Sequence, residues 1–156
     1  MIKIVWISDP HFQRAGRIEG LDPRMRLETA LEYANAHYAD ADMLVISGDL
    51  AGHDPEDYAA LQKVLYESKI SVFPMMGIHD ERAYLRDHLP LPKTTMPDFI
   101  QYAIETSVET VICLDMHKVG SHAGELCPTR LALLDETLGN TPNIPALIFM
   151  HHPPLA

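Results

Sequence analysis

A carboxylate and an imidazole stand two positions apart near the N-terminus, in Asp9-Pro10-His11. They follow an apolar run over residues 2–7 that is typical of a β-strand. Residues i and i+2 of an extended chain point to the same side, so both side chains can converge just past the strand. Carboxylate oxygen and imidazole nitrogen together suit a transition metal such as Fe, Mn or Zn. The alternative is a turn with a solvated Asp9 and a capping His11.

Three further apolar runs end in residues of the same kinds. Residues 43–47 lead into Gly48-Asp49, and residues 70–76 lead into Gly77-Ile78-His79-Asp80. Residues 146–150 lead into His151-His152-Pro153-Pro154. Four predicted strands therefore end in residues with ligand chemistry.

Amphipathic helices are predicted between the first three strands. Asp22-Pro23 and Asp54-Pro55 each combine an N-cap acid with a proline at the first helical position. Helical spacing of apolar residues extends the first helix over 23–38, and a short helix is expected over 81–88. The buried faces are predicted to carry Leu27, Ala30, Leu31, Ala34 and Tyr38 in the first helix, and Tyr58, Leu61, Leu65 and Tyr66 in the second.

Alternating strands and helices with short links predict right-handed βαβ units and a parallel sheet. In such sheets, ligands bind outside the carboxyl ends of the strands. The first three strand ends should therefore bring Asp9, His11, Asp49, His79 and Asp80 to one edge.

The second half of the chain is predicted to contain a hairpin and one more helix. Residues 99–105 and 110–114 are β-rich and are joined through residues 106–109. Pro128 starts a helix that should end at Gly139-Asn140. Its predicted buried face carries Leu131, Leu134 and Leu138.

Composition limits the possible classes of protein. A chain of 156 residues, 47% of them hydrophobic, fits one domain with a substantial core. The net charge of −10 argues against nucleic acid polymers and anionic membranes as partners. Cys113 and Cys127 suggest buried thiols in a reducing compartment. With no visible signal peptide and no apolar run of membrane-spanning length, we expect a cytoplasmic protein without a membrane partner.

The ordered blocks resemble the signature of the calcineurin-like metallophosphoesterase superfamily, which runs D-x-H, G-D, G-N-H-[DE], a His-bearing strand end and G-H-x-H. Asp9-Pro10-His11, Gly48-Asp49 and most of Gly77-Ile78-His79-Asp80 match the first three blocks. The segment Phe149-Met150-His151-His152-Pro153-Pro154 is similar to the glycerophosphodiesterase and class III cyclic-nucleotide phosphodiesterase branch.

The resemblance implies an α/β fold, the N-terminal half of a four-layer αββα sandwich, with a largely parallel βαβαβ sheet plus a β-hairpin. Residues 1–156 would form a single phosphoesterase domain that is truncated before the C-terminal half, which carries G-H-x-H and the partner sheet. We expect a homo-oligomer to cover the exposed sheet face.

The resemblance also implies roles for particular residues. Asp9 and His11 would bind a first metal, Asp49 would bridge two metals, and His151 would bind the second. His79 would be the catalytic histidine beside the substrate phosphate, and not a ligand. The cofactors would be two divalent or trivalent transition metals (Fe, Mn or Zn).

The sequence departs from the family pattern at Ile78, where the family has a metal-binding Asn. The second metal site would then bind weakly or stay empty. His152 should point away from His151 on an extended chain and act in the outer shell or in the structure.

The implied function is a metal-dependent phosphodiesterase. It would hydrolyse small phosphodiesters, such as glycerophosphodiesters or cyclic nucleotides, by in-line attack of a metal-activated hydroxide. One alternative is a catalytically impaired fragment that acts as a binding or oligomerisation module. Another is a phosphomonoesterase or nuclease of the same superfamily. Further polar residues lie in loops near the strand ends and are interpreted as solvated: His53, His117, His122, Arg14 and Arg17.

Overall fold

The first sheet is parallel and has the strand order β1-β2-β3. The computed structural model describes residues 1–154, so the last two residues of the predicted domain, Leu155 and Ala156, lie outside the described part. The strands are β1 (Ile4–Ile7), β2 (Met43–Ile46) and β3 (Val72–Pro74), each parallel to its neighbour. The predicted parallel βαβαβ unit is therefore confirmed.

Two helices connect these strands, and both begin where the sequence predicts. In α1 (Pro23–His37), the Asp22 carboxylate accepts a hydrogen bond from the backbone N–H of Met25 at 3.0 Å. In α2 (Pro55–Leu65), Asp54 accepts one from the N–H of Glu56 at 2.9 Å. Each cap satisfies a backbone donor that has no partner within the helix.

The second sheet contains the predicted hairpin and the last strand. β4 (Tyr102–Glu105) is antiparallel to β5 (Thr110–Cys113), which confirms the hairpin. β6 (Ala146–Phe149) pairs with β5 in parallel, so the strand order is β4-β5-β6. The chain thus contains two three-stranded sheets, one parallel and one mixed.

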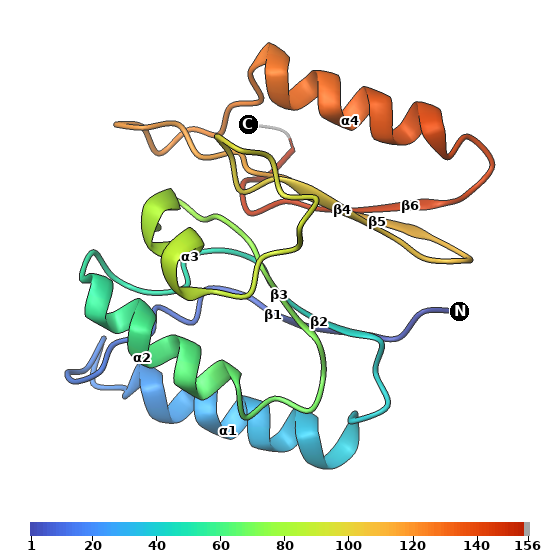
Figure 1. The fold of residues 1–156 in the computed structure, drawn as a ribbon. Helices are drawn as coiled ribbons and strands as arrows, with labels where there is room; N and C mark the ends of the chain where they lie inside the picture. Colours follow the sequence, from blue (N-terminus) through green and yellow to red (C-terminus); the bar gives the residue numbers. More distant parts are fainter. Residues whose placement is uncertain (155–156) are drawn as a thin grey trace.

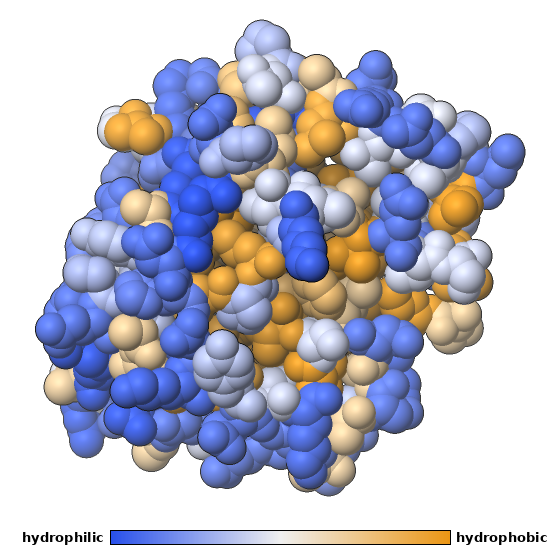
Figure 2. All heavy atoms as spheres, in the orientation of Figure 1, coloured by the Kyte–Doolittle hydropathy of each residue, from blue (hydrophilic) through white to orange (hydrophobic). Residues whose placement is uncertain are grey.

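The two sheets face each other between outer layers of helices (Figure 1). α1 and α2 cover the outer side of the first sheet, and α4 (Pro128–Asn140) covers the outer side of the second. The short helix α3 (Arg82–His88) lies beside the ends of the strands. Figure 2 shows apolar side chains gathered in the middle of this face, over the space between the sheets. The expectation that the partner sheet lies beyond this chain is therefore wrong.

Side chains from both sheets meet in one core. The hydroxyl of Tyr102 in β4 donates a hydrogen bond to the carbonyl of Pro74 in β3 at 2.8 Å. The rings of Trp6 in β1 and Phe149 in β6 contact edge to face, with centroids 5.6 Å apart. The inner face of the first sheet is thus covered within the chain, so no oligomer is needed to cover it.

The open apolar surface lies instead at the edges of the sheets. β1 and β6 are each an outer strand of their sheet. Trp6, Leu147 and Ile148 on these strands are 63%, 41% and 36% exposed. An outer strand with exposed apolar residues can pair with a further strand.

The predicted buried face of α4 is wrong. Leu131 and Leu138 are exposed, whereas Arg130 and Thr137 are buried. The guanidinium of Arg130 donates to the carbonyl of Asp115 at 2.7 Å and lies over the Phe99 ring, 4.6 Å from its centroid. With Arg130 held by these long-range partners, Leu131 and Leu138 face outward, whereas Leu134 is partly buried. Tyr66, predicted on the buried face of α2, lies one residue past the helix end and is exposed.

The prediction of buried thiols holds for one of the two cysteines. Cys113 is buried, and burial raises its pKa to about 12. Cys127 is only partly buried. None of the helices within residues 1–154 is long and apolar enough to span a membrane.

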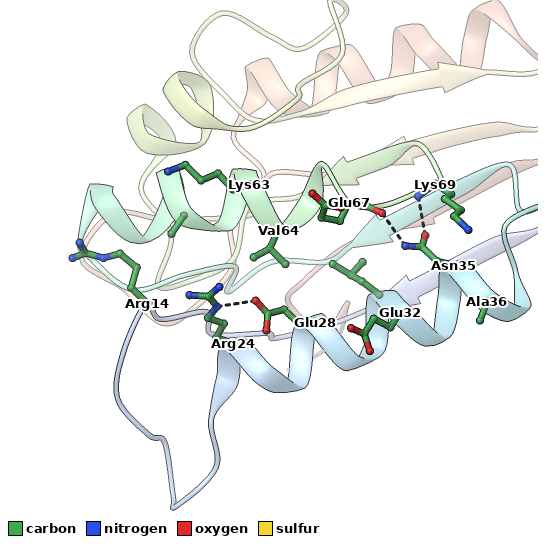
Figure 3. A pocket seen from close by; sticks show the side chains of 12 residues that line it. Arg14, Arg24, Glu28, Glu32, Asn35, Ala36, Lys63, Val64, Glu67 and Lys69 are labelled. Carbon is green, nitrogen blue, oxygen red and sulfur yellow. Dashed lines mark hydrogen bonds and ion pairs between the residues drawn. The ribbon is translucent and has the colours of Figure 1, made fainter.

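A groove lies between α1 and α2, away from the strand ends (Figure 3). Its volume is about 880 Å³, and side chains of both signs line it. Arg24 pairs with Glu28 at 2.7 Å within it. The side chain of Asn35 ties α1 to the segment after α2, because it donates to the carbonyl of Glu67 and accepts from the N–H of Lys69. Internal partners therefore satisfy several of its polar groups.

Candidate metal centre

The loops after β1 and β2 lie side by side, which brings His11 next to Asp49. The backbone N–H of His11 donates to the carbonyl of Asp49 at 2.9 Å, and that of Phe12 donates to Leu50 at 2.9 Å. These two bonds extend the pairing of the strands past their ends. The loop positions that carry chemistry are thus fixed by the backbone.

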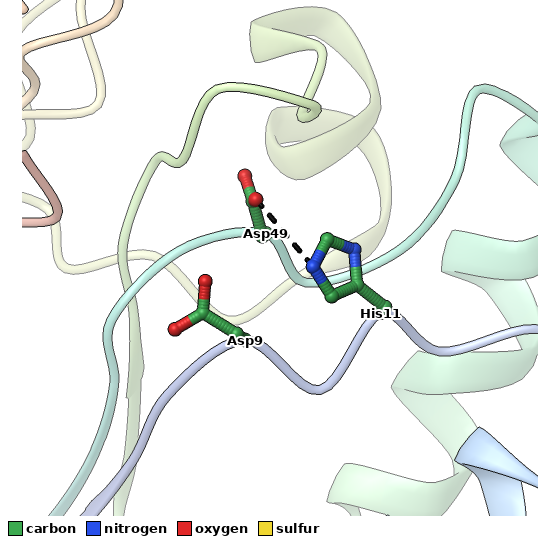
Figure 4. A group of neighbouring side chains, drawn as sticks. All are labelled: Asp9, His11 and Asp49. Carbon is green, nitrogen blue, oxygen red and sulfur yellow. Dashed lines mark ion pairs between the residues drawn. The ribbon is translucent and has the colours of Figure 1, made fainter. Parts of the chain in front are cut away.

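Asp9, His11 and Asp49 point toward one another (Figure 4). Each offers one ligand atom, and these atoms all lie within 4.8 Å of one another. Nε2 of His11 is 3.6 Å from Oδ2 of Asp49. Asp49 is only 5% exposed. A buried carboxylate is costly unless positive charge or hydrogen bonds compensate it, so this cluster suits a cation.

His151 reaches the same carboxylate from the second sheet. Its Nε2 lies 3.5 Å from Oδ1 of Asp49. Its Nδ1 lies 2.8 Å from the carbonyl oxygen of Ser47, which can only accept a hydrogen bond. Nδ1 must therefore carry a proton, so in the neutral ring the lone pair is on Nε2, the nitrogen nearer to Asp49. A backbone carbonyl that orients an imidazole in this way is a recurrent feature of metal-binding histidines.

His79 lies on the remaining side of Asp49. Its backbone N–H donates to Oδ1 of Asp49 at 2.9 Å, and its Nε2 is 3.9 Å from Oδ2. The ring is 5.7 Å from that of His11, centroid to centroid. Its side chain is 45% exposed, in contrast to the buried carboxylate. His79 is thus anchored by its backbone and accessible by its ring.

The backbone is strained at the residues of this cluster. Among residues 1–154, four non-glycine residues have a positive φ, and three of them are Asp9 (52°), His11 (43°) and Asp49 (49°). The left-handed region is unfavourable for residues with a Cβ. Such strain commonly gathers at functional sites.

Two glycines allow the loops to approach so closely. A Cβ on Gly77 would lie 2.1 Å from the backbone nitrogen of Asp49. A Cβ on Gly48 would lie 2.6 Å from Nδ1 of His151 and 2.7 Å from Cα of Gly77. Both positions exclude any side chain, because real atoms never come so close.

Asp80 does not join the cluster, although it was expected at the same edge. It is 1% exposed and accepts hydrogen bonds from Tyr58 and from the N–H groups of Leu50 and Gly77, at 2.7–2.9 Å. Burial raises the pKa of Asp80, and these hydrogen bonds oppose the rise. Its role is to tie the loop after β2 to the loop after β3.

Two histidines interpreted as solvated lie next to His79. The ring centroids of His53 and His122 are 6.3 Å and 6.2 Å from that of His79. Their positions in loops next to the strand ends were the only sequence signal. The other loop residues have different surroundings: Arg14 pairs with Asp54, Glu56 and Asp57, and Arg17 donates to the carbonyl of Gly20.

His117 and His152 are packed behind the cluster. His152 is 5% exposed and lies against Gly124, whose added Cβ would be 2.7 Å from Cγ of the ring. Burial lowers the pKa of His152, and the neighbouring His151 and His117 lower it further. Burial also lowers the pKa of His117, with Arg82 adding to the effect. Both rings therefore favour the neutral form.

The residues fit one metal ion better than two. Asp9, His11 and Asp49 supply oxygen and nitrogen donors within reach of one ion. For a second ion, the described residues offer Asp49 and His151. The side chain of Ile78 has no donor atom to add.

The calcineurin-like phosphoesterase family profile matches residues 2–156, so this chain belongs to that family. The predicted resemblance is therefore confirmed. A probable cyclic nucleotide phosphodiesterase of Rhodopseudomonas palustris is 35% identical over 159 residues, covering 98% of this chain and 58% of that protein.

Two further relatives are named as a glycerophosphodiesterase and a cyclic-nucleotide phosphodiesterase, the two activities of the predicted branch. The glycerophosphodiester phosphodiesterase GpdQ of Enterobacter lignolyticus is 29% identical, covering 96% of this chain and 56% of the relative. The 3′,5′-cyclic adenosine monophosphate phosphodiesterase CpdA of Vibrio vulnificus is 26% identical, covering 99% and 56%. The chain spans about half the length of the curated relatives it matches.

Proposed function

We propose that this chain carries the metal-binding residues of a phosphodiesterase that hydrolyses small phosphodiesters. The observation that carries the proposal is the buried Asp49 carboxylate, with His11, His79 and His151 all within 3.9 Å of its oxygens. In a family of metal-dependent phosphoesterases, such an arrangement supports metal binding more than a structural role.

In this proposal, Asp9, His11 and Asp49 hold the first metal, and Asp49 and His151 contribute to the second. Metal ions bound there would supply positive charge for the phosphate oxygens and lower the pKa of a nearby water. The Ser47 carbonyl keeps His151 in the tautomer that can coordinate.

His79 acts on the leaving group. Its backbone is fixed to Asp49 while its ring stays half exposed, so Nε2 can reach a bound phosphodiester. A proton held on this nitrogen would pass to the departing alkoxide. Hydrogen bonding to the developing negative charge would also stabilise the in-line transition state.

The substrate in this proposal is a small diester. Relatives are named for cyclic nucleotides and for glycerophosphodiesters. The net charge of −10 opposes the approach of long polyanions such as nucleic acids. A phosphomonoesterase or nuclease activity is therefore less well supported. The cytoplasmic location remains a prediction.

The proposal also includes self-association of the chain, because the second metal site is incomplete. We propose that residues 1–156 form a single domain that associates with a second copy at the open edges of β1 and β6. Exposed Trp6, Leu147 and Ile148 support this contact. Ile78 favours the alternative function, a domain that binds one metal and serves as a binding or oligomerisation module without turnover.

Metal analysis combined with hydrolysis of bis(p-nitrophenyl) phosphate tests the proposal. We expect Mn²⁺ to bind, the Mn²⁺-loaded chain to hydrolyse the diester, and Asp9→Asn to lose both properties. Ile78→Asn should increase turnover by adding a donor. If both the wild type and Ile78→Asn bind metal without turnover, the alternative function as a binding module is favoured. If neither metal nor turnover appears, and Ile78→Asn restores neither, the proposal is wrong.

A further inference from the structure

Three imidazoles from three separate loops lie together on the open side of the candidate metal centre. His79 follows β3, His53 lies between β2 and α2, and His122 lies between β5 and α4. His79 is in the middle, with ring centroids 6.3 Å from His53 and 6.2 Å from His122. Both pairs of rings are T-shaped, with interplanar angles of 68° and 64°. The three rings therefore border one space beside His79.

These rings lie farther out than the cluster around Asp49. Nε2 of His79 is 3.9 Å from the buried carboxylate, and its side chain is 45% exposed. His53 and His122 are both exposed. If the phosphate of a diester is bound at Asp49, one of its alcohol groups would have room to extend past His79 toward the two outer rings.

The loop that carries His122 is firmly anchored. Asp115 is fully buried and receives two hydrogen bonds from the guanidinium of Arg82, at 2.7 Å and 2.8 Å. The same guanidinium donates to the carbonyl of His117 at 2.8 Å. The N–H of Glu125 donates to the carbonyl of Met116 at 2.9 Å and closes the loop. His122 is thus presented by a braced segment.

The loop that carries His53 is held on both sides. Before it, the N–H groups of Leu50 and Ala51 donate to Asp80 at 2.9 Å and 3.4 Å. After it, Asp54 caps α2 and pairs with Arg14. A braced loop loses little conformational freedom when its side chains bind a ligand.

We propose that His53 and His122 bind the alcohol part of the phosphodiester and select alcohols that carry hydroxyl groups. This inference rests on the proposed function. A neutral imidazole has one donor and one acceptor, so it can pair with a hydroxyl in either direction. An alcohol without hydroxyls leaves those bonds unmade and binds less well. With His79 between them, the two residues form an imidazole rim that determines specificity.

The test compares two ligands that differ only in the alcohol part. Titration calorimetry measures the binding of glycerol 3-phosphate and methyl phosphate to the Zn²⁺-loaded chain. We expect His53→Ala and His122→Ala each to weaken glycerol 3-phosphate binding about fivefold, the size of one lost hydrogen bond, and to leave methyl phosphate binding unchanged. His53→Asn, which keeps a donor and an acceptor, should recover part of the loss.

His37→Ala is the matched control, because His37 is an exposed histidine on α1 that stacks on Tyr33. It should change neither affinity. Nitrogen NMR of the histidine rings gives a readout independent of turnover: signals of His53 and His122 should shift with glycerol 3-phosphate, and that of His37 should not. Thermal melting checks that each variant is folded.

Two results would overturn the inference while the proposed function stands. In the first, the ratio of the two affinities is the same in wild type, His53→Ala and His122→Ala. In the second, the substitutions weaken the binding of both ligands equally, which would mean that the rings contact the phosphate and not the alcohol. If the wild type takes up no Zn²⁺, or binds neither phosphate, the proposed function fails and this inference fails with it.

Discussion

Replacing Asp49 by asparagine should separate the metal-dependent stability of this chain from its intrinsic stability. Asp49→Asn removes the charge at the centre of the cluster and keeps the size of the side chain. Oδ1 can still accept the hydrogen bond from the N–H of His79. The new amide replaces Oδ2, which lies 3.6 Å from Nε2 of His11. Without metal, we therefore expect a change of no more than about 1 kcal/mol.

With metal, the two proteins should differ strongly. A ligand that binds only the folded state at 100 times its Kd stabilises that state by about 2.7 kcal/mol. For a chain of this size, each kcal/mol corresponds to about 2–4 °C in Tm. Mn²⁺ should therefore raise the Tm of the wild type by roughly 5–11 °C. Asp49→Asn should lose most of that rise, because it lacks the anionic ligand.

Thermal melting with Mn²⁺ and with a chelator measures both quantities. Asp135→Asn is the control, since Asp135 is an exposed acid on α4 and should respond to Mn²⁺ as the wild type does. An equal rise in Asp49→Asn and wild type would refute the reasoning, because the metal would then bind elsewhere. No rise in the wild type would refute it as well.

Two further predictions concern the scaffold. Asp80→Asn places an amide where both carboxylate oxygens accept buried N–H groups. At least one donor loses its acceptor, so we expect a cost of about 1–3 kcal/mol and a Tm lower by roughly 2–12 °C in chelator, which thermal melting would measure. A Tm equal to that of the wild type would contradict this. Light scattering at micromolar concentration should give a mass above the 17.5 kDa of one chain, and Leu147→Glu should return it to a monomer. A monomeric wild type would exclude association at the edges.

The sequence predicted the first sheet and the strand-end cluster because both depend on local rules. Asp22 and Asp54 mark helix starts through bonds to the next two or three residues. Parallel strands then bring their carboxyl ends together whatever the loops contain. Asp49, His11 and His79 were placed at one edge for this reason, and their distances agree with it.

The sequence-based predictions failed where a residue distant in sequence determines which way a helix or side chain faces. Leucines at helical spacing predicted the buried face of α4, but Arg130 takes that face because Asp115 and Phe99 bind its guanidinium. Asp80 lies at the predicted edge, but its sequence position does not reveal that its carboxylate is buried and bonded to Tyr58. The sequence did not show that β4, β5 and β6 form the sheet that packs against the first one, because short strands do not reveal which sheet they join.

The left-handed backbone at Asp9, His11 and Asp49 sets the stability of the fold against the ligand atoms that these residues offer. Strain of this kind costs of order 1–3 kcal/mol per residue, against a total stability of about 5–15 kcal/mol for a typical protein. Glycine would occupy these positions more cheaply. A glycine at any of these positions would relieve the strain, but it would also remove one of the three candidate ligand atoms.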